Sequence, residues 1–229
     1  MELVEFLLRW VHLLAGVTWI GLLYYFNFVQ TPFFAETEAS TRSGAIQKLV
    51  PRALWWFRWG AMFTFLAGIL MWLIKLGQFG ADFFVIGYGM AITIGGTMGT
   101  IMFLNVWLVI WPNQQVVIAS ANKVAEGGEA LPDAASKGQW AGFASRTNTL
   151  FSIPMLFLMG AASHYPHGEY GGGVAVYWIV TLVIIAIVEL NALVGNAGGG
   201  TKKLLTSIPN VLWSGFILTA IFWILLEMA

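Results

Sequence analysis

The stretch from Phe84 to Trp111, FVIGYGMAITIGGTMGTIMFLNVWLVIW, decides the fold class of this chain. It contains no charged residue, and it is longer than the roughly 20 apolar residues that a helix needs to cross a bilayer. Gly95 and Gly99 form a G-x-x-x-G pair, which lets helix backbones approach each other closely. The stretch therefore predicts a membrane-spanning helix at the centre of a bundle.

Five other stretches complete this prediction. The chain has 229 residues, of which 59% are hydrophobic and 10% charged, whereas a soluble domain carries about 25% charged residues. We predict an all-α integral membrane protein with one domain, residues 1–229. Its six transmembrane helices are expected at about 4–29, 54–76, 84–111, 148–165, 176–194 and 208–227.

The connecting segments predict the orientation. Lysines and arginines gather in the connections after the first, third and fifth predicted helices: Arg42, Lys48, Arg52, Lys123, Lys137, Arg146, Lys202 and Lys203. The opposite side has Arg9 and Lys75. Because cytoplasmic loops carry the Lys/Arg excess, we expect both termini outside a bacterial inner membrane that the chain crosses several times, in contact with lipid. Residues 35–50 suggest a short surface helix, and residues 125–133 a solvated turn.

Composition also excludes several function classes. The net charge is zero, which argues against a nucleic-acid partner. Without cysteine, the chain has no disulfide, no iron–sulfur cluster and no attachment site for a c-type haem. No G-x-G-x-x-G, P-loop, G-x-S-x-G or H-E-x-x-H motif is present, so any redox chemistry would come from a bound cofactor.

Two histidines are the strongest candidates for a cofactor site. His12 falls one turn inside the first predicted helix, and His164 closes the fourth, near the same side of the membrane. Ionisable side chains in a membrane are costly and are functional-site candidates by default. Gly16 and Gly160 lie one turn further into the membrane, where a missing side chain would leave room for a flat macrocycle. We predict haem b with His12 and His164 as the ligands of its iron.

Arg9 shares the helix face of His12 and would bind a haem propionate. Glu5, four residues earlier, is placed for a surface pair with Arg9. Two alternatives remain open at this point. Both imidazoles could be interfacial residues bonded to backbone or water, or His164 and His167 could hold a copper or another metal ion, although Pro166 lies between them.

A second group of polar residues gathers toward the predicted cytoplasmic side and forms a candidate substrate site: Asn27, Arg58, Asn105, Arg146, Asn148 and Glu189. An unpaired carboxylate at the depth of Glu189 would be costly, so we predict that Arg146 or Arg58 pairs with it. The alternative is a polar network that ties the helices together.

Several blocks of this chain resemble the membrane part of the PuuD-type urate hydroxylases, over roughly residues 9–166. The blocks are Arg9-Trp10-Val11-His12, Gly16 to Gly21 with Tyr24-Tyr25-Phe26, Trp56 to Trp59, Asn105-Val106-Trp107 to Trp111-Pro112-Asn113-Gln114, and Ser145-Arg146-Thr147-Asn148 through Ser163-His164-Tyr165-Pro166. The resemblance implies urate oxidation at the bacterial inner membrane, with electrons passed to a fused cytochrome c domain. This chain ends at Ala229 without such a domain, so the expected acceptor is a separate periplasmic cytochrome c.

Two functions follow from these observations. The first is a haem-binding membrane oxidoreductase that oxidises a purine-like substrate. The alternative is a non-catalytic haem or structural subunit of a larger respiratory or oxygenase complex, with other membrane subunits as its partners. A transporter would need a pathway between paired broken helices, and only the region of Asn113 and Arg146 suggests one.

Overall fold

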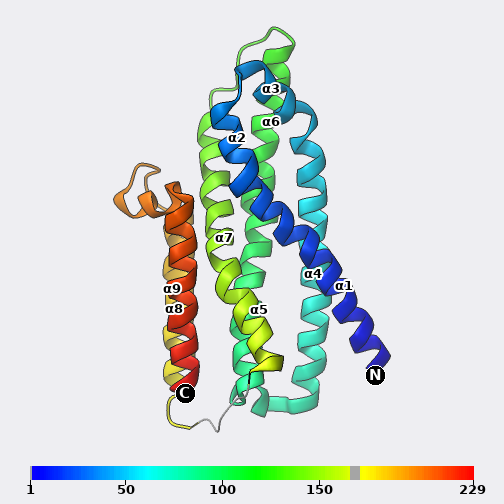
Figure 1. Ribbon diagram of the computed structural model, residues 1–229, viewed down its shortest axis with the longest axis vertical. Coiled ribbons are helices and arrows are strands. Elements are labelled where there is room, and N and C mark those ends of the chain that lie inside the picture. The colour runs from blue at the N-terminus through cyan, green and yellow to red at the C-terminus, as the bar shows by residue number, and fades with distance from the viewer. Residues whose placement is uncertain (1, 166–170) are drawn as a thin grey trace.

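The computed structural model describes residues 2–165 and 171–229, and this part of the chain is helical without any strand (Figure 1). The prediction of an all-α protein is confirmed. The elements, in order, are α1 (Glu2–Tyr24), the π-helix η1 (Tyr25–Gln30), α2 (Thr31–Glu36), α3 (Ala39–Lys48), α4 (Val50–Phe79), the 3-10 helix η2 (Gly80–Phe84), α5 (Gly87–Leu104), the π-helix η3 (Asn105–Ile110), α6 (Trp111–Ala125), α7 (Ala134–His164), α8 (Val174–Leu193), the 3-10 helix η4 (Gly200–Thr206) and α9 (Ile208–Glu227).

Five stretches of the described chain are long and apolar enough to cross a membrane. They are Glu2–Glu36, Val50–Phe84, Gly87–Ala125, Val174–Leu193 and Ile208–Glu227. The fourth predicted span does not qualify by hydropathy, yet it belongs to the 31-residue helix α7. This helix begins at Ala134 rather than near 148, so the polar run Ser145 to Thr149 lies inside it. Most of that run is buried against other helices, which explains how a polar segment stays helical there.

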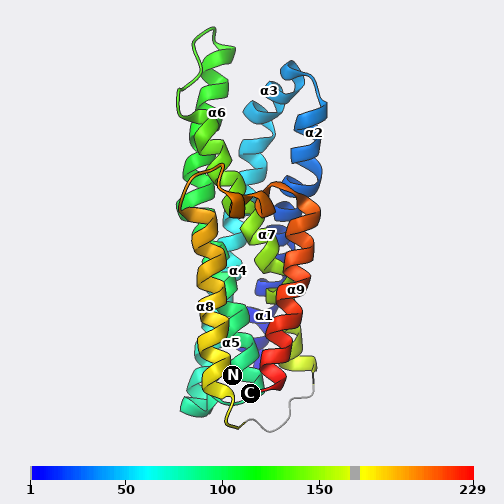
Figure 2. The same cartoon turned by 90° about the vertical axis from the view of Figure 1, so that its left-hand side faces the viewer.

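The helices pack as a bundle with α7 in its interior (Figures 1 and 2). α1 crosses α4, whereas α7 lies between α5 and α9. Gly95 of α5 would place a Cβ only 3.4 Å from the carbonyl oxygen of Met155, and Gly215 of α9 would place one 3.0 Å from that of Leu150. The predicted close packing at Gly95 is therefore confirmed. The start of α1 and the residue Ala229 lie at the same end of the bundle (Figure 2).

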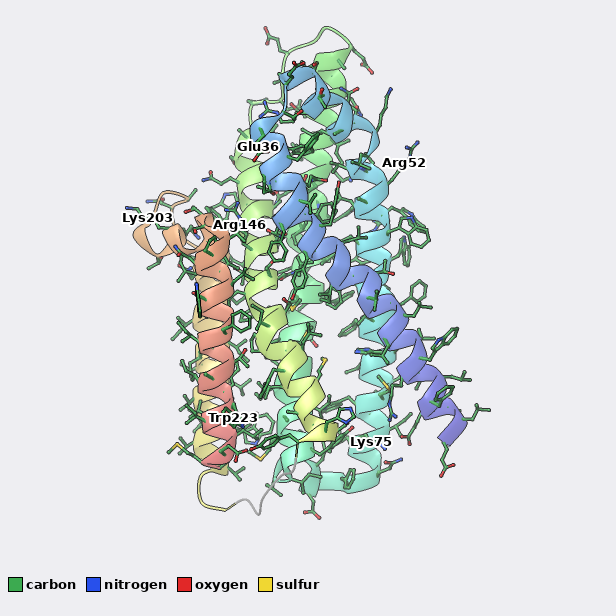
Figure 3. All side chains as sticks on the ribbon, in the orientation of Figure 1. Glu36, Arg52, Lys75, Arg146, Lys203 and Trp223 are labelled. Carbon is green, nitrogen blue, oxygen red and sulfur yellow. The ribbon has the colours of Figure 1, made fainter. Side chains whose placement is uncertain are left out.

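The bundle is longer than its last two helices. α8 and α9 have 20 residues each, which at 1.5 Å per residue is about 30 Å and matches the hydrocarbon thickness of a bilayer. The helical stretch Gly87–Ala125 has 39 residues, or about 58 Å. Figure 3 places Arg146 level with the loop that carries Lys203, while Glu36 and Arg52 lie beyond it. The predicted surface helix (α3) and the predicted turn after Ala125 are both present at this far end.

Both π-helices end just before a proline. Pro32 and Pro112 follow in α2 and α6, and a proline has no N–H to donate to the carbonyl four residues earlier. The backbone instead forms bonds over five residues, from the N–H of Thr31 to Phe26 and from that of Trp111 to Val106. Such π segments are frequent at functional sites, and these two begin beside the candidate polar residues Asn27 and Asn105.

Candidate functional site

Small residues on α4 bring α1 and its histidine into close contact. Gly60, Thr64 and Gly68 recur every four residues and so share one face of α4. A Cβ on Gly60 would lie 3.2 Å from the backbone nitrogen of Trp19, and one on Gly68 would lie 3.0 Å from Cε1 of His12. The imidazole of His12 is thus held against the backbone of α4 rather than toward lipid.

A hydrogen bond determines the tautomer of His12. Its Nδ1 lies 2.8 Å from the backbone carbonyl oxygen of Thr64. A carbonyl accepts and cannot donate, so Nδ1 carries the proton and Nε2 keeps its lone pair. Histidines that bind metals commonly donate their other N–H to a backbone carbonyl in this way. The geometry at His12 therefore fits an imidazole that binds iron through Nε2.

His164 lies toward the same end of the bundle as His12, on a different helix. The hydroxyls of Tyr24 in α1 and Ser152 in α7 are 2.9 Å apart, and the two helices run in opposite directions (Figure 1). His12 is twelve residues before Tyr24, and His164 is twelve residues after Ser152, so each lies about 18 Å from this contact along its helix. His164 is exposed, and α1 diverges from α7 toward this end (Figure 1). The described structure records no contact between the two imidazoles.

The glycines beneath the two histidines have different surroundings. Gly16 faces α4, where its Cβ would lie 3.8 Å from Cγ2 of Thr64, whereas nothing lies within 4 Å of a Cβ on Gly160. Helix packing therefore accounts for Gly16, and open space is found beside Gly160. His167, the partner of His164 in the alternative metal site, lies outside the described residues. The described part contains no group of three or more potential metal ligands.

Arg9 is exposed at the start of α1, and its expected pairing with Glu5 is wrong. Glu5 instead pairs with Lys75 of α4 at 2.8 Å, and Gln78 donates to it as well. Lys75 is three residues from Gln78 and bonds to it, so the carboxylate meets a preformed cluster on α4. Arg9 is left without a partner among the described residues.

The predicted polar group is divided among separate contacts. Asn27 donates to Ser145 of α7 at 2.9 Å, so it ties η1 to α7. Arg146 donates to the backbone carbonyl of Leu205 in η4 at 2.7 Å. Both contacts join elements that are far apart in sequence, and both side chains have their partners within the protein.

Asn105, Asn148 and Glu189 form a network between η3, α7 and α8. The amide nitrogen of Asn105 donates to Oδ1 of Asn148 at 2.9 Å and to Oε2 of Glu189 at 3.2 Å. Asn148 in turn donates to the carbonyl of Met102 at 3.0 Å. The predicted pairing of Glu189 with Arg146 or Arg58 is wrong, because the described residues give Glu189 no cationic partner. A neutral amide satisfies the carboxyl group instead.

Arg58 has a different environment from the other five. Its guanidinium carbon lies 3.9 Å from the ring centroid of Trp111, 4.8 Å from that of Trp107 and 5.6 Å from that of Trp59. Its Nε is buried without a hydrogen-bond partner, and so is Nε1 of Trp107. Arg58 is therefore surrounded by aromatic rings, and its Nε–H has no acceptor.

The role of Lys202 was not predicted from the sequence. This side chain is 2% exposed, and its Nζ donates to the carbonyls of Asn191, Ala192 and Val194 at 2.6, 3.3 and 2.8 Å. It also lies 4.7 Å from the ring centroid of Trp140. Burial lowers the pKa of Lys202, while the negative end of the α8 dipole and the ring face stabilise its charge. Lys202 caps α8, whereas the neighbouring Lys203 is exposed.

The comparisons with known proteins place the chain in a family. The family model described as "Urate oxidase N-terminal" matches residues 78–224. This range includes Asn105, Asn148, Gly160, His164 and Glu189, and it extends through the last two helices. No curated protein and no solved structure matches the chain. Because the matched range covers more than half of its residues, the chain belongs to the urate oxidase N-terminal family.

Proposed function

We propose that this protein is a haem-binding oxidoreductase of the bacterial inner membrane that oxidises a purine-like substrate. The family supports the substrate class, and the tautomer of His12 supports the cofactor. The bond from Nδ1 to the carbonyl of Thr64 is the single observation that carries the proposal, because it leaves Nε2 free to bind iron.

The proposed topology has six spans, with α7 as the sixth beside the five apolar stretches. Both chain ends lie at one end of the bundle (Figure 2), as an even number of crossings requires. The loops with the Lys/Arg excess lie at the other end and would face the cytoplasm. His12, His164 and the exposed Arg9 would then lie toward the periplasm.

The proposed site uses haem b between α1 and α7. His12 and His164 would hold its iron, and Arg9 would pair with a propionate. When bound, haem supplies an iron that carries one electron at a time. The chain itself orients the His12 ring through Thr64 and keeps it against Gly68. The open space beside Gly160 is where the macrocycle would meet α7.

The proposed reaction is a two-electron oxidation. A purine such as urate would be hydroxylated with an oxygen atom from water, and two electrons and two protons would be released. The protons would leave to water, and the electrons would reduce two molecules of a separate periplasmic cytochrome c. Asn27, Asn105, Arg146, Asn148 and Glu189 have partners in the protein, so Arg58 is the member of the predicted substrate group that remains free to bind a ligand.

The test is whether urate reduces the haem of the purified protein in a lipid nanodisc, with the reduction monitored by absorbance. The expected result is reduction by urate without added reductant, and re-oxidation by ferricytochrome c. Adenine and water alone serve as controls. If haem is present but no purine reduces it, the proposed reaction is wrong, and the alternative of a non-catalytic haem subunit is favoured.

A further inference from the structure

Two buried N–H groups of the cluster formed by Arg58 and its tryptophans have no acceptor. Nε of Arg58 and Nε1 of Trp107 are both buried and unpartnered, and the guanidinium carbon is 4.8 Å from the centroid of the Trp107 ring. Leaving a buried donor unsatisfied costs about 1–3 kcal/mol, and more for a charged group. Two such donors in one cluster indicate a place for an acceptor from outside the chain.

The charge of Arg58 also lacks a counter-ion. Within the described residues, the ion pair of Glu5 with Lys75 is the one recorded, and it lies on the far part of α4. Three tryptophan rings surround the guanidinium (Trp59, Trp107 and Trp111). They stabilise a cation through its faces but accept no hydrogen bond in its plane. An anion that binds along the edge of the guanidinium would supply both the charge and the acceptor.

The position of Arg58 suits a ligand that enters from the loop side. Trp111 begins α6, and Asn105, six residues earlier, reaches Glu189 in the last turn of α8. Arg58 therefore lies near the level where α8 ends, at the boundary of the proposed membrane region. Its own side chain and the three rings are half-buried, so part of the cluster reaches the surface of the bundle. Arg58 also precedes Thr64 by six residues on α4, about 9 Å, which places it near the histidine site.

We propose that Arg58 and Trp107 bind the anionic edge of the oxidised substrate, a planar heterocyclic anion such as urate. This inference rests on the proposed function. An oxygen of the anion accepts from Nε of Arg58 and from Nε1 of Trp107, while the flat ring system lies among the tryptophans. The π-helix η3 (Asn105–Ile110) carries Trp107 and sets the position of its indole.

The experiment measures urate binding to the oxidised protein by isothermal titration calorimetry, in nanodiscs of phosphatidylcholine alone. R58Q removes the charge, and R52Q is its matched control, because Arg52 is exposed on the same helix. W107F removes the indole donor but keeps an aromatic ring, and W56F is its control, because Trp56 is exposed and does not contact Arg58. We expect R58Q to bind urate about 10- to 100-fold more weakly than the wild type. W107F should be several-fold weaker, with R52Q and W56F unchanged.

Two results would overturn the inference. One is equal urate affinity in the wild type, R58Q and W107F. The other is a phospholipid that native mass spectrometry finds on the wild type and not on R58Q, together with unchanged urate affinity, since a headgroup phosphate would then fill the site. Because binding is measured without electron transfer, failure of haem reduction by urate would count against the proposed function alone. If urate reduces the haem of the wild type and of R58Q with the same KM, the proposed function stands and only this site is refuted.

Discussion

Replacement of Lys202 by methionine tests how much one buried ammonium contributes to the end of α8. Lys202 Nζ has three carbonyl acceptors, from Asn191, Ala192 and Val194. Methionine keeps the length and apolar stem of the side chain but cannot donate. The substitution therefore leaves these carbonyls without their side-chain donor and removes the cation from the face of Trp140.

The magnitude follows from opposing contributions. Hydrogen bonds to a charged group contribute about 1.5–3 kcal/mol, and a desolvated cation–π contact about 2 kcal/mol. The favourable position at a helix C-terminus adds roughly 0.3–2 kcal/mol. The cost of burying the ammonium, several kcal/mol, offsets part of this sum. We expect K202M to lower the free energy of unfolding by about 2–4 kcal/mol, within the range of point mutations that break a buried polar network.

The assay is thermal unfolding in nanodiscs, with K203M as the matched control. For a chain of this size, 1 kcal/mol corresponds to roughly 2–4 °C in Tm, so K202M should unfold about 5–15 °C lower. K203M should change little, because Lys203 is exposed. Hydrogen exchange should also become faster at residues 191–194 in K202M. Equal Tm values for K202M and K203M would refute the capping role.

Two further predictions concern the interior of the bundle. Asn148→Ala should destabilise the protein by about 1–3 kcal/mol, because the amide of Asn105 loses a buried acceptor and the carbonyl of Met102 loses its side-chain donor. Glu189→Gln should leave the Tm nearly unchanged, because a glutamine oxygen still accepts the same hydrogen bond. A larger loss in the Glu189 variant than in the Asn148 variant would contradict this reading. Gly89→Ala should cost at least 1–3 kcal/mol, since its Cβ would overlap the carbonyl of Phe83. Gly77→Ala, with nothing within 4 Å, should be neutral or stabilising by up to about 1 kcal/mol, and equal effects of the two glycine variants in denaturant unfolding would disprove the steric argument.

Much of the fold could be predicted from the sequence because it depends on apolar length and glycine spacing. The stretch from Phe84 to Trp111 indicated an interior helix, and Gly95 does pack against α7. The start of α7 could not be predicted in the same way. Its first half is polar, and a hydropathy profile does not show which polar side chains form hydrogen bonds with other helices. Asn148, for example, donates to a carbonyl of α5.

The candidate site could be predicted only in part, because sequence places residues on helix faces without naming their partners. That His12 and His164 lie toward the same end of the bundle followed from their positions in the chain. Nothing in the sequence indicated that Thr64 would accept the bond from His12. Long polar side chains had the least predictable surroundings: Arg58 stacks on tryptophans, and Lys202, which was counted from the sequence only as a loop charge, caps a helix.

The most direct measurement of the central claim is the absorption spectrum of the purified protein, oxidised and dithionite-reduced. The wild type should show the Soret and α bands of haem b, and His12→Ala should lose them. Val11→Ala, the exposed neighbour on the same helix, should keep them. A wild-type protein without a Soret band, or a His12→Ala variant with unchanged haem content, would contradict the account.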